Sequence, residues 1–77
     1  MSGADESGYV PELGSYAVDS RDGRVGRVMS RDGSYVLLRP PGGGTQWDCP
    51  PESVHPAPPG EVLRAKVTEM NRERRYP

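Results

Sequence analysis

Residues 16–39 decide the fold and read YAVDSRDGRVGRVMSRDGSYVLLR. Short apolar segments alternate in this stretch with two Asp-Gly pairs, Asp22-Gly23 and Asp32-Gly33. Asp-Gly is a strong signal for a tight hairpin, because glycine adopts the positive φ that such turns require. The stretch therefore predicts positive φ at both glycines and antiparallel strands over residues 16–18, 24–29 and 34–39.

The residues that follow predict two more short strands. Pro40-Pro41-Gly42-Gly43-Gly44 indicates a loop, since glycine there permits positive φ. Residues 45–49 favour a fourth strand, residues 50–54 a single 3₁₀ turn, and Val54-His55 a last short strand. Four or five short strands without room for helical crossovers indicate an all-β meander. Closure would remove its edges, so we expect a small SH3-like antiparallel β-barrel of 4–5 strands with a C-terminal α-helix.

The expected interior of this barrel comes from the apolar segments. Alternation does not settle the third strand, because Tyr35 and Leu37 take the opposite face from Val36 and Leu38. A bulge at Gly26 would also shift the second strand. The residues that we expect in the core are Val18, Val28, Val36, Leu38 and Trp47.

The two ends of the chain differ from its middle. We predict a disordered segment over residues 1–13, the barrel over 14–56, a proline-rich connector over 57–60 and a charged helix over 61–75. Leu63, Val67 and Met70 form one apolar stripe on that helix. A helix of about fifteen residues is marginal alone in water, so it needs a surface to lie on. That surface is either its own barrel or a partner's groove.

Two resemblances accompany these patterns. Val25-Gly26-Arg27-Val28, with Asp32-Gly33 and Tyr35-Val36-Leu37-Leu38, resembles the core of KOW-type motifs, where the glycine permits a sharp strand bend. Over most of its length the chain is similar to a group of small uncharacterised proteins of actinobacteria, especially streptomycetes. The segments that carry this second similarity are Tyr16 to Asp19, Gly23 to Met29, Leu38 to Gly44, Trp47 to Glu52 and Leu63 to Asn71. The similarity implies a cytoplasmic accessory protein tied to regulation.

Composition excludes several classes of function. The chain has 77 residues, a net charge of −1 and one cysteine, so it fits one small domain without a disulfide. It lacks an apolar run of membrane-spanning length and a signal-peptide pattern, and with the single cysteine this predicts a cytoplasmic location. One histidine and one cysteine cannot supply the four ligands of a structural zinc site, and no cofactor motif is present.

Candidate chemistry is sparse. Cys49 and His55 could approach as a thiol-imidazole pair, but nothing else supports catalysis, so we expect no enzyme and no catalytic residue. Arg21, Arg24, Arg27, Arg31 and Arg39 would form a phosphate-binding stripe if they shared one face, yet aspartates alternate with them.

We therefore expect a non-enzymatic protein-interaction module, and the alternative is a nucleic-acid-binding module of KOW-like type. Tyr16, Tyr35 and Trp47 could line an aromatic groove for a proline-rich peptide, and the helix could serve a partner through its stripe. The candidate partner-binding residues are Tyr16, Tyr35, Trp47, Leu63, Val67 and Met70. The oligomeric state and the identity of the partner stay open at this point.

Overall fold

A computed structural model describes residues 9–73 of the chain. Residues 1–8 of the predicted disordered segment, and residues 74–75 of the predicted helix, lie outside the described residues. Residues 9–13 of that segment lie against the body of the protein. Tyr9 packs against the hydrophobic core, Pro11 is buried, and the Arg31 guanidinium donates a hydrogen bond to the Pro11 carbonyl oxygen.

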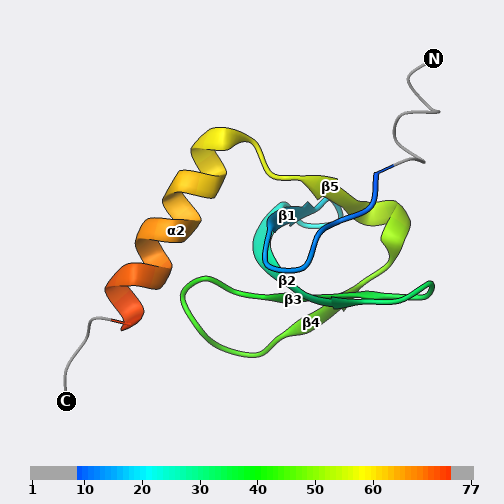
Figure 1. Cartoon of the computed structure of the whole chain (residues 1–77), viewed down its shortest axis with the longest axis horizontal. Helices are drawn as coiled ribbons and strands as arrows, with labels where there is room; N and C mark the ends of the chain where they lie inside the picture. Colours follow the sequence, from blue (N-terminus) through cyan, green and yellow to red (C-terminus); the bar gives the residue numbers. More distant parts are fainter. Residues whose placement is uncertain (1–8, 74–77) are drawn as a thin grey trace.

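The described chain forms one antiparallel sheet and one long helix (Figure 1). The strands lie side by side in the order β4-β3-β2-β1-β5, so each of the first four pairs with its neighbour in sequence and β5 returns to pair with β1. The elements are β1 (Tyr16–Asp19), β2 (Arg24–Arg31), β3 (Val36–Arg39), β4 (Trp47–Cys49), the 3₁₀ turn η1 (Pro51–Ser53), β5 (Val54–Pro56) and α2 (Pro59–Glu73).

The sheet curls but does not close, so the predicted closed barrel is wrong. β4 and β5 are its two edges, and no ladder of hydrogen bonds joins them. Each edge strand has only three residues, and the chain passes from one edge to the other through η1. Pro50, Pro51 and Pro56 flank or end these strands, and proline has no N–H to donate to a ladder.

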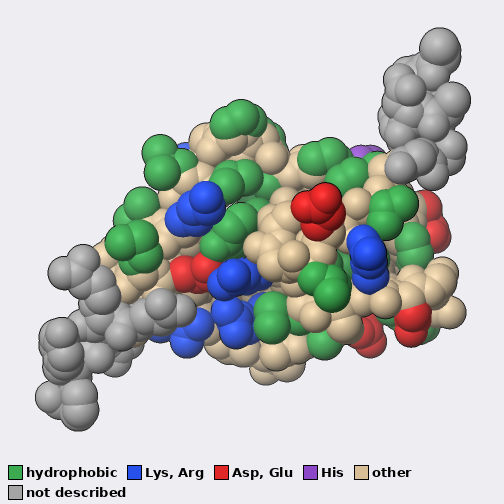
Figure 2. All heavy atoms as spheres, in the orientation of Figure 1, with side chains coloured by type: hydrophobic (Ala, Val, Ile, Leu, Met, Phe, Trp, Pro, Cys, Tyr) green, Lys and Arg blue, Asp and Glu red, His purple; other side chains and the backbone are tan. Residues whose placement is uncertain are grey.

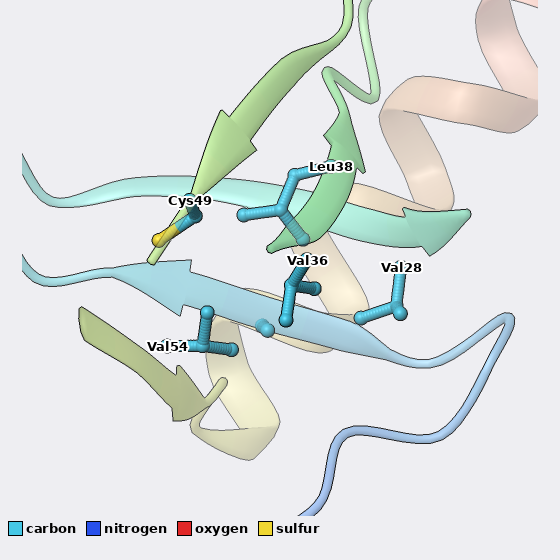
Figure 3. Close-up of a cluster of buried hydrophobic side chains, with 6 residues drawn as sticks. Val28, Val36, Leu38, Cys49 and Val54 are labelled. Atoms are coloured by element: carbon cyan, nitrogen blue, oxygen red, sulfur yellow. The ribbon is translucent and has the colours of Figure 1, made fainter. Parts of the chain in front are cut away.

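The core lies on the concave face of the sheet (Figure 3). Val28, Val36 and Leu38 are buried as predicted, and Trp47 packs against them while staying partly exposed. The prediction for Val18 is wrong, because Ala17 and Asp19 face inward and Val18 faces outward. The buried apolar residues of the sheet are Ala17, Val28, Val36, Leu38, Cys49 and Val54.

Gly26 explains why the sheet can bend so tightly. A Cβ atom at this position would lie 2.9 Å from Leu38 Cβ and 2.9 Å from the Trp47 ring. The missing side chain therefore makes room for both residues on the concave face. The bulge expected at Gly26 lies farther along β2, between Val28 and Ser30.

Of the two turn glycines, Gly23 has the predicted positive φ, at 80°. Gly33 does not, because the Asp32 carboxylate shapes its turn instead. Asp32 Oδ1 accepts hydrogen bonds from the backbone N–H groups of Ser34, at 2.8 Å, and Tyr35, at 3.0 Å. An Asx turn of this kind needs no left-handed residue.

Helix α2 begins at Pro59, two residues before the predicted start, as the fixed φ of proline allows at a first helical position. It lies along one side of the sheet (Figure 1). Over residues 9–73, no helix is both long enough and apolar enough to cross a membrane.

The close approach at Gly26 generates a first prediction. Gly26→Ala should lower the free energy of unfolding by roughly 1 to 3 kcal/mol, because the new methyl group overpacks the core. Gly33→Ala is the matched control, since a Cβ there meets no atom within 4 Å. Urea denaturation followed by Trp47 fluorescence measures both variants. Equal stability of the two variants would contradict this role of Gly26.

Candidate functional site

The structure does not bring together the three aromatic residues that were predicted to line one groove. Tyr35 is 53% exposed in the connection between β2 and β3. Trp47 faces the core, whereas Tyr16 lies on the opposite face of the sheet, beneath α2. A cavity of about 300 Å³ is lined by Tyr16 together with Tyr9 and Pro56, but neither Trp47 nor Tyr35 lines it.

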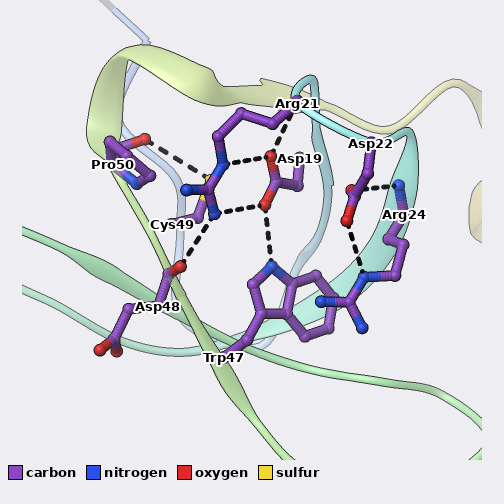
Figure 4. Close-up of polar contacts among 8 residues, drawn as sticks. All are labelled: Asp19, Arg21, Asp22, Arg24, Trp47, Asp48, Cys49 and Pro50. Carbon is purple, nitrogen blue, oxygen red and sulfur yellow. Dashed lines mark hydrogen bonds and ion pairs between the residues drawn. The ribbon is translucent and has the colours of Figure 1, made fainter.

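A buried carboxylate, Asp19, organises the end of the sheet where Trp47 lies (Figure 4). Its side chain is 1% exposed. Oδ1 accepts hydrogen bonds from the Arg21 backbone N–H at 2.9 Å and from Arg21 Nε at 3.1 Å. Oδ2 accepts from Arg21 Nη2 at 2.8 Å and from Trp47 Nε1 at 2.9 Å. The Arg21 side chain above all holds the pKa of Asp19 well below its usual range.

These contacts fix Trp47 in place. The Arg24 guanidinium lies 3.7 Å from the centroid of the indole ring and is itself bound to Asp22. Arg21 Nη2 also donates to the Asp48 carbonyl oxygen at 3.0 Å, which ties the β1–β2 turn to edge strand β4. The indole therefore serves the fold as part of the core wall. Sequence reasoning missed this role of Asp19. The available signal was its place at the end of a strand, two residues before Arg21.

In the candidate thiol-imidazole pair, the sulfur of Cys49 is not placed to act as a nucleophile. Cys49 is fully buried, and its Sγ lies 3.6 Å from the Pro50 carbonyl oxygen. Burial, followed by the nearby Asp19 carboxylate, raises the pKa of Cys49 to about 11. The sulfur is therefore a protonated thiol at neutral pH. Within residues 9–73, no group of three or more His, Cys, Asp or Glu side chains could hold a metal ion.

A second buried carboxylate, Glu69, holds α2 against the sheet. Tyr16, Arg27 and Arg39 occupy one row across β1, β2 and β3, because Arg27 is the register partner of both others. Glu69 is 5% exposed and contacts all three. Tyr16 Oη donates a hydrogen bond to Glu69 Oε1, Arg27 Nη1 lies 3.5 Å from Oε1, and Arg39 Nη2 lies 3.8 Å from Oε2. We call these four residues the Glu69 seam.

The Glu69 seam holds α2 to its own sheet without the apolar stripe, for which both the chain's own barrel and a partner's groove were considered. Ala65, 4% exposed, is the one buried apolar residue in the described part of α2. Two buried atoms of the seam, Glu69 Oε2 and Arg39 Nε, have no hydrogen-bond partner among the described residues. Each unsatisfied buried polar group costs about 1 to 3 kcal/mol. The helix is therefore docked by charge, with little apolar burial to support it.

Three larger apolar residues of α2 point away from the sheet. Leu63, Val67 and Met70 are 64%, 48% and 52% exposed, and we call them the outer stripe. Figure 2 shows hydrophobic side chains along the helix and basic side chains gathered where the helix meets the sheet. Arg64 and Lys66, both exposed, flank the outer stripe. Sequence reasoning found the stripe and missed Glu69, whose spacing of four from Ala65 marks the docked face.

The five arginines considered for a phosphate-binding stripe all contact oxygen atoms of this chain. Arg21 and Arg24 pair with Asp19 and Asp22, respectively. The other three are Arg27 and Arg39, which pair with Glu69, and Arg31, which binds the Pro11 carbonyl. These contacts divide the arginines among three places on the molecule.

The Asp19 contacts predict a pH-dependent contribution to stability. Asp19→Asn should lower the free energy of unfolding by about 2 kcal/mol at pH 7, since it weakens hydrogen bonds to a charged acceptor. Because the pKa of Asp19 is depressed in the folded state, this stabilisation is present above its unfolded pKa of about 4 and is lost as the pH falls toward the folded pKa. Urea denaturation at pH 7, 4 and 2 measures the difference.

Asp22→Asn is the control for that series, because Asp22 and Arg24 are half-exposed and such pairs contribute less than about 1 kcal/mol. A difference between wild type and Asp19→Asn that stayed constant from pH 7 to pH 2 would refute the charged role of Asp19.

The buried thiol predicts slow alkylation. At pH 8, Cys49 of the folded protein should react with iodoacetamide at least about 100-fold more slowly than in urea. Burial keeps the reagent away from the sulfur and keeps the thiol protonated. A Ser34→Cys, Cys49→Ala variant places the thiol in an exposed turn and should react at the unfolded rate. Mass spectrometry over time gives both rates, and fast alkylation of native Cys49 would contradict its burial.

Comparison with known proteins adds no relative to this geometry. A scan against protein-family models, a search of curated proteins and a search of solved structures all find no match.

Proposed function

We propose that this chain is a non-enzymatic protein-interaction module of the cytoplasm, in which the curled sheet is a platform that presents the outer face of α2 to a partner protein. The observation that carries the proposal is the exposure of the outer stripe. Its three apolar side chains lie opposite Ala65 and Glu69, which face the sheet. Apolar residues at this spacing are the anchors by which helices bind hydrophobic grooves.

The charges beside the outer stripe support one kind of partner. Arg64 and Lys66 lie on its two sides, and Glu61, the acidic residue nearest the helix start, forms an ion pair with Arg64 at 3.8 Å. A groove with an apolar floor and an acidic rim would complement this face. Pairing two copies of α2 through the stripe would bring basic flanks together, which disfavours a homodimer. The helix is already formed, so binding needs little further ordering.

We also propose that the open sheet has an SH3-like arrangement. The strand order, with one 3₁₀ turn directly before a last strand that returns to β1, supports an open SH3-like arrangement. We further propose that the chain belongs with the small actinobacterial proteins that its sequence resembles. The nucleic-acid alternative of KOW-like type has less support, because the five arginines considered for a phosphate-binding stripe already contact oxygen atoms of the chain itself.

The proposal predicts that binding depends on the outer stripe. A photo-crosslinking amino acid at position 67 should capture a protein in native cytoplasm, whereas the same group at position 35 should not. With the purified captured protein, a Leu63→Ser, Val67→Ser, Met70→Ser variant should bind at least about 100-fold more weakly, since apolar anchors dominate such interfaces. Tyr35→Ser is the matched control, because it removes an exposed apolar side chain outside α2.

Two outcomes would overturn the proposal. Full affinity of the triple variant would show that the outer stripe is not the binding surface. Binding that disappears after nuclease treatment and falls steeply with added salt would instead show a nucleic-acid-binding module, because phosphate contacts release counterions.

A further inference from the structure

The row beneath α2 has the composition of a carboxylate receptor. A phenol hydroxyl and two guanidinium groups, from Tyr16, Arg27 and Arg39, lie side by side on three neighbouring strands. Guanidinium groups are the donors that best match carboxylate oxygens, and a hydroxyl adds a third hydrogen bond. In this structure the carboxylate that they contact is Glu69 of the same chain.

Charge around the row exceeds what Glu69 neutralises. Arg27 and Arg39 stand directly opposite each other in the β2–β3 ladder, and like charges in such positions repel. Arg72, one turn along the helix from Glu69, adds a third guanidinium near the β3–β4 loop, where Nε donates to the Pro41 carbonyl oxygen at 3.3 Å. Among the described side chains, Glu69 is the carboxylate that pairs with both Arg27 and Arg39, whereas Arg72 contacts a backbone carbonyl.

Glu69 also fills the row imperfectly. Its oxygens lie 3.5 and 3.8 Å from the two guanidinium groups, longer than a charge-assisted hydrogen bond, and Oε2 and Arg39 Nε lack hydrogen-bond partners within residues 9–73. A separate cavity of about 350 Å³ lies between α2 and the sheet, N-terminal to Glu69 along the helix, with Val25, Pro41 and Ala65 among its lining residues. The helix is thus loosely packed over the turns that precede its docking carboxylate.

We propose that the row of Tyr16, Arg27 and Arg39 is a binding site for a carboxylate of an acidic protein segment, and that Glu69 occupies it as an internal competitor. A carboxylate supplied in trans would take the three donors and release α2 from the sheet. This site lies on the sheet, under the face of α2 that is opposite the outer stripe, so it goes beyond the proposed function and can be tested independently of it.

The test removes the competitor and supplies a carboxylate from solution. In full-length Glu69→Ala, acetate should bind saturably and shift the NMR signals of the Arg27 and Arg39 Nε–H groups and of the Tyr16 ring. The wild type should need at least tenfold more acetate for the same shift. A capped Ala-Glu-Ala peptide should shift them at lower concentration than acetate, and capped Ala-Gln-Ala should not shift them.

Control variants keep the outcomes distinct. Glu69→Gln removes the charge and preserves the size of the side chain, and unchanged Val36 and Leu38 amide signals in it report an intact sheet. The proposal fails if acetate produces no saturable shift in either Glu69 variant. It also fails if the shifts survive in the double variant Glu69→Ala, Arg39→Gln, because that result would mean an adventitious ion only. A third contradicting result is tighter binding of inorganic phosphate than of acetate at equal ionic strength.

Discussion

The buried carboxylate of Asp19 is the interaction on which the sheet depends. A curled sheet with short edge strands has few ladder hydrogen bonds at its ends, and here side chains supply the missing connections. Asp19 positions Arg21, which reaches the β4 edge, and Trp47, which covers the core. Burying a charge is tolerated only when it is paired and hydrogen-bonded, and Asp19 meets both conditions. Without it, Arg21 would lose its ion pair and Trp47 would lose the acceptor of its N–H group.

A second buried carboxylate, Glu69, also binds arginines on the other face of the sheet, but its hydrogen bonds are less complete than those of Asp19. Asp19 has its hydrogen bonds at 2.8 to 3.1 Å. Glu69 has one close donor and two guanidinium groups at longer range. The interior of the sheet is therefore firmly specified, whereas the position of α2 is weakly specified. This difference suits a domain in which the sheet is a scaffold and the helix is the part that meets other molecules.

The sequence patterns predicted the order and type of the elements, because Asp-Gly turns and short apolar segments are local signals. They predicted Val28, Val36 and Leu38 in the core for the same reason. They failed at Val18, because hydrophobicity alone favours valine over its neighbours, whereas Ala17 and Asp19 face inward and Asp19 meets Trp47, a residue far away in the sequence. Barrel closure failed because the two edge strands have only three residues each and end in or beside a proline, which has no N–H to donate to a ladder.

The helix shows the same limit of sequence reasoning. The apolar stripe left two surfaces open, the chain's own sheet and a partner's groove, and in this structure the stripe is exposed. Glu69 docks because Arg27 and Arg39 meet it from strands that lie far away in the sequence, and only the register of the sheet brings them together. No local pattern contains that information.

The strand order has a consequence for how the chain is made. Because β1 to β4 pair with their neighbours in sequence, a nascent chain can form most of the sheet from local contacts, which favours rapid folding. The ladder between β1 and β5 and the docking of Glu69 both require the last third of the sequence. The meander therefore leaves the ribosome with one edge and one face still uncovered, and β5 and α2, which are synthesised later, cover them.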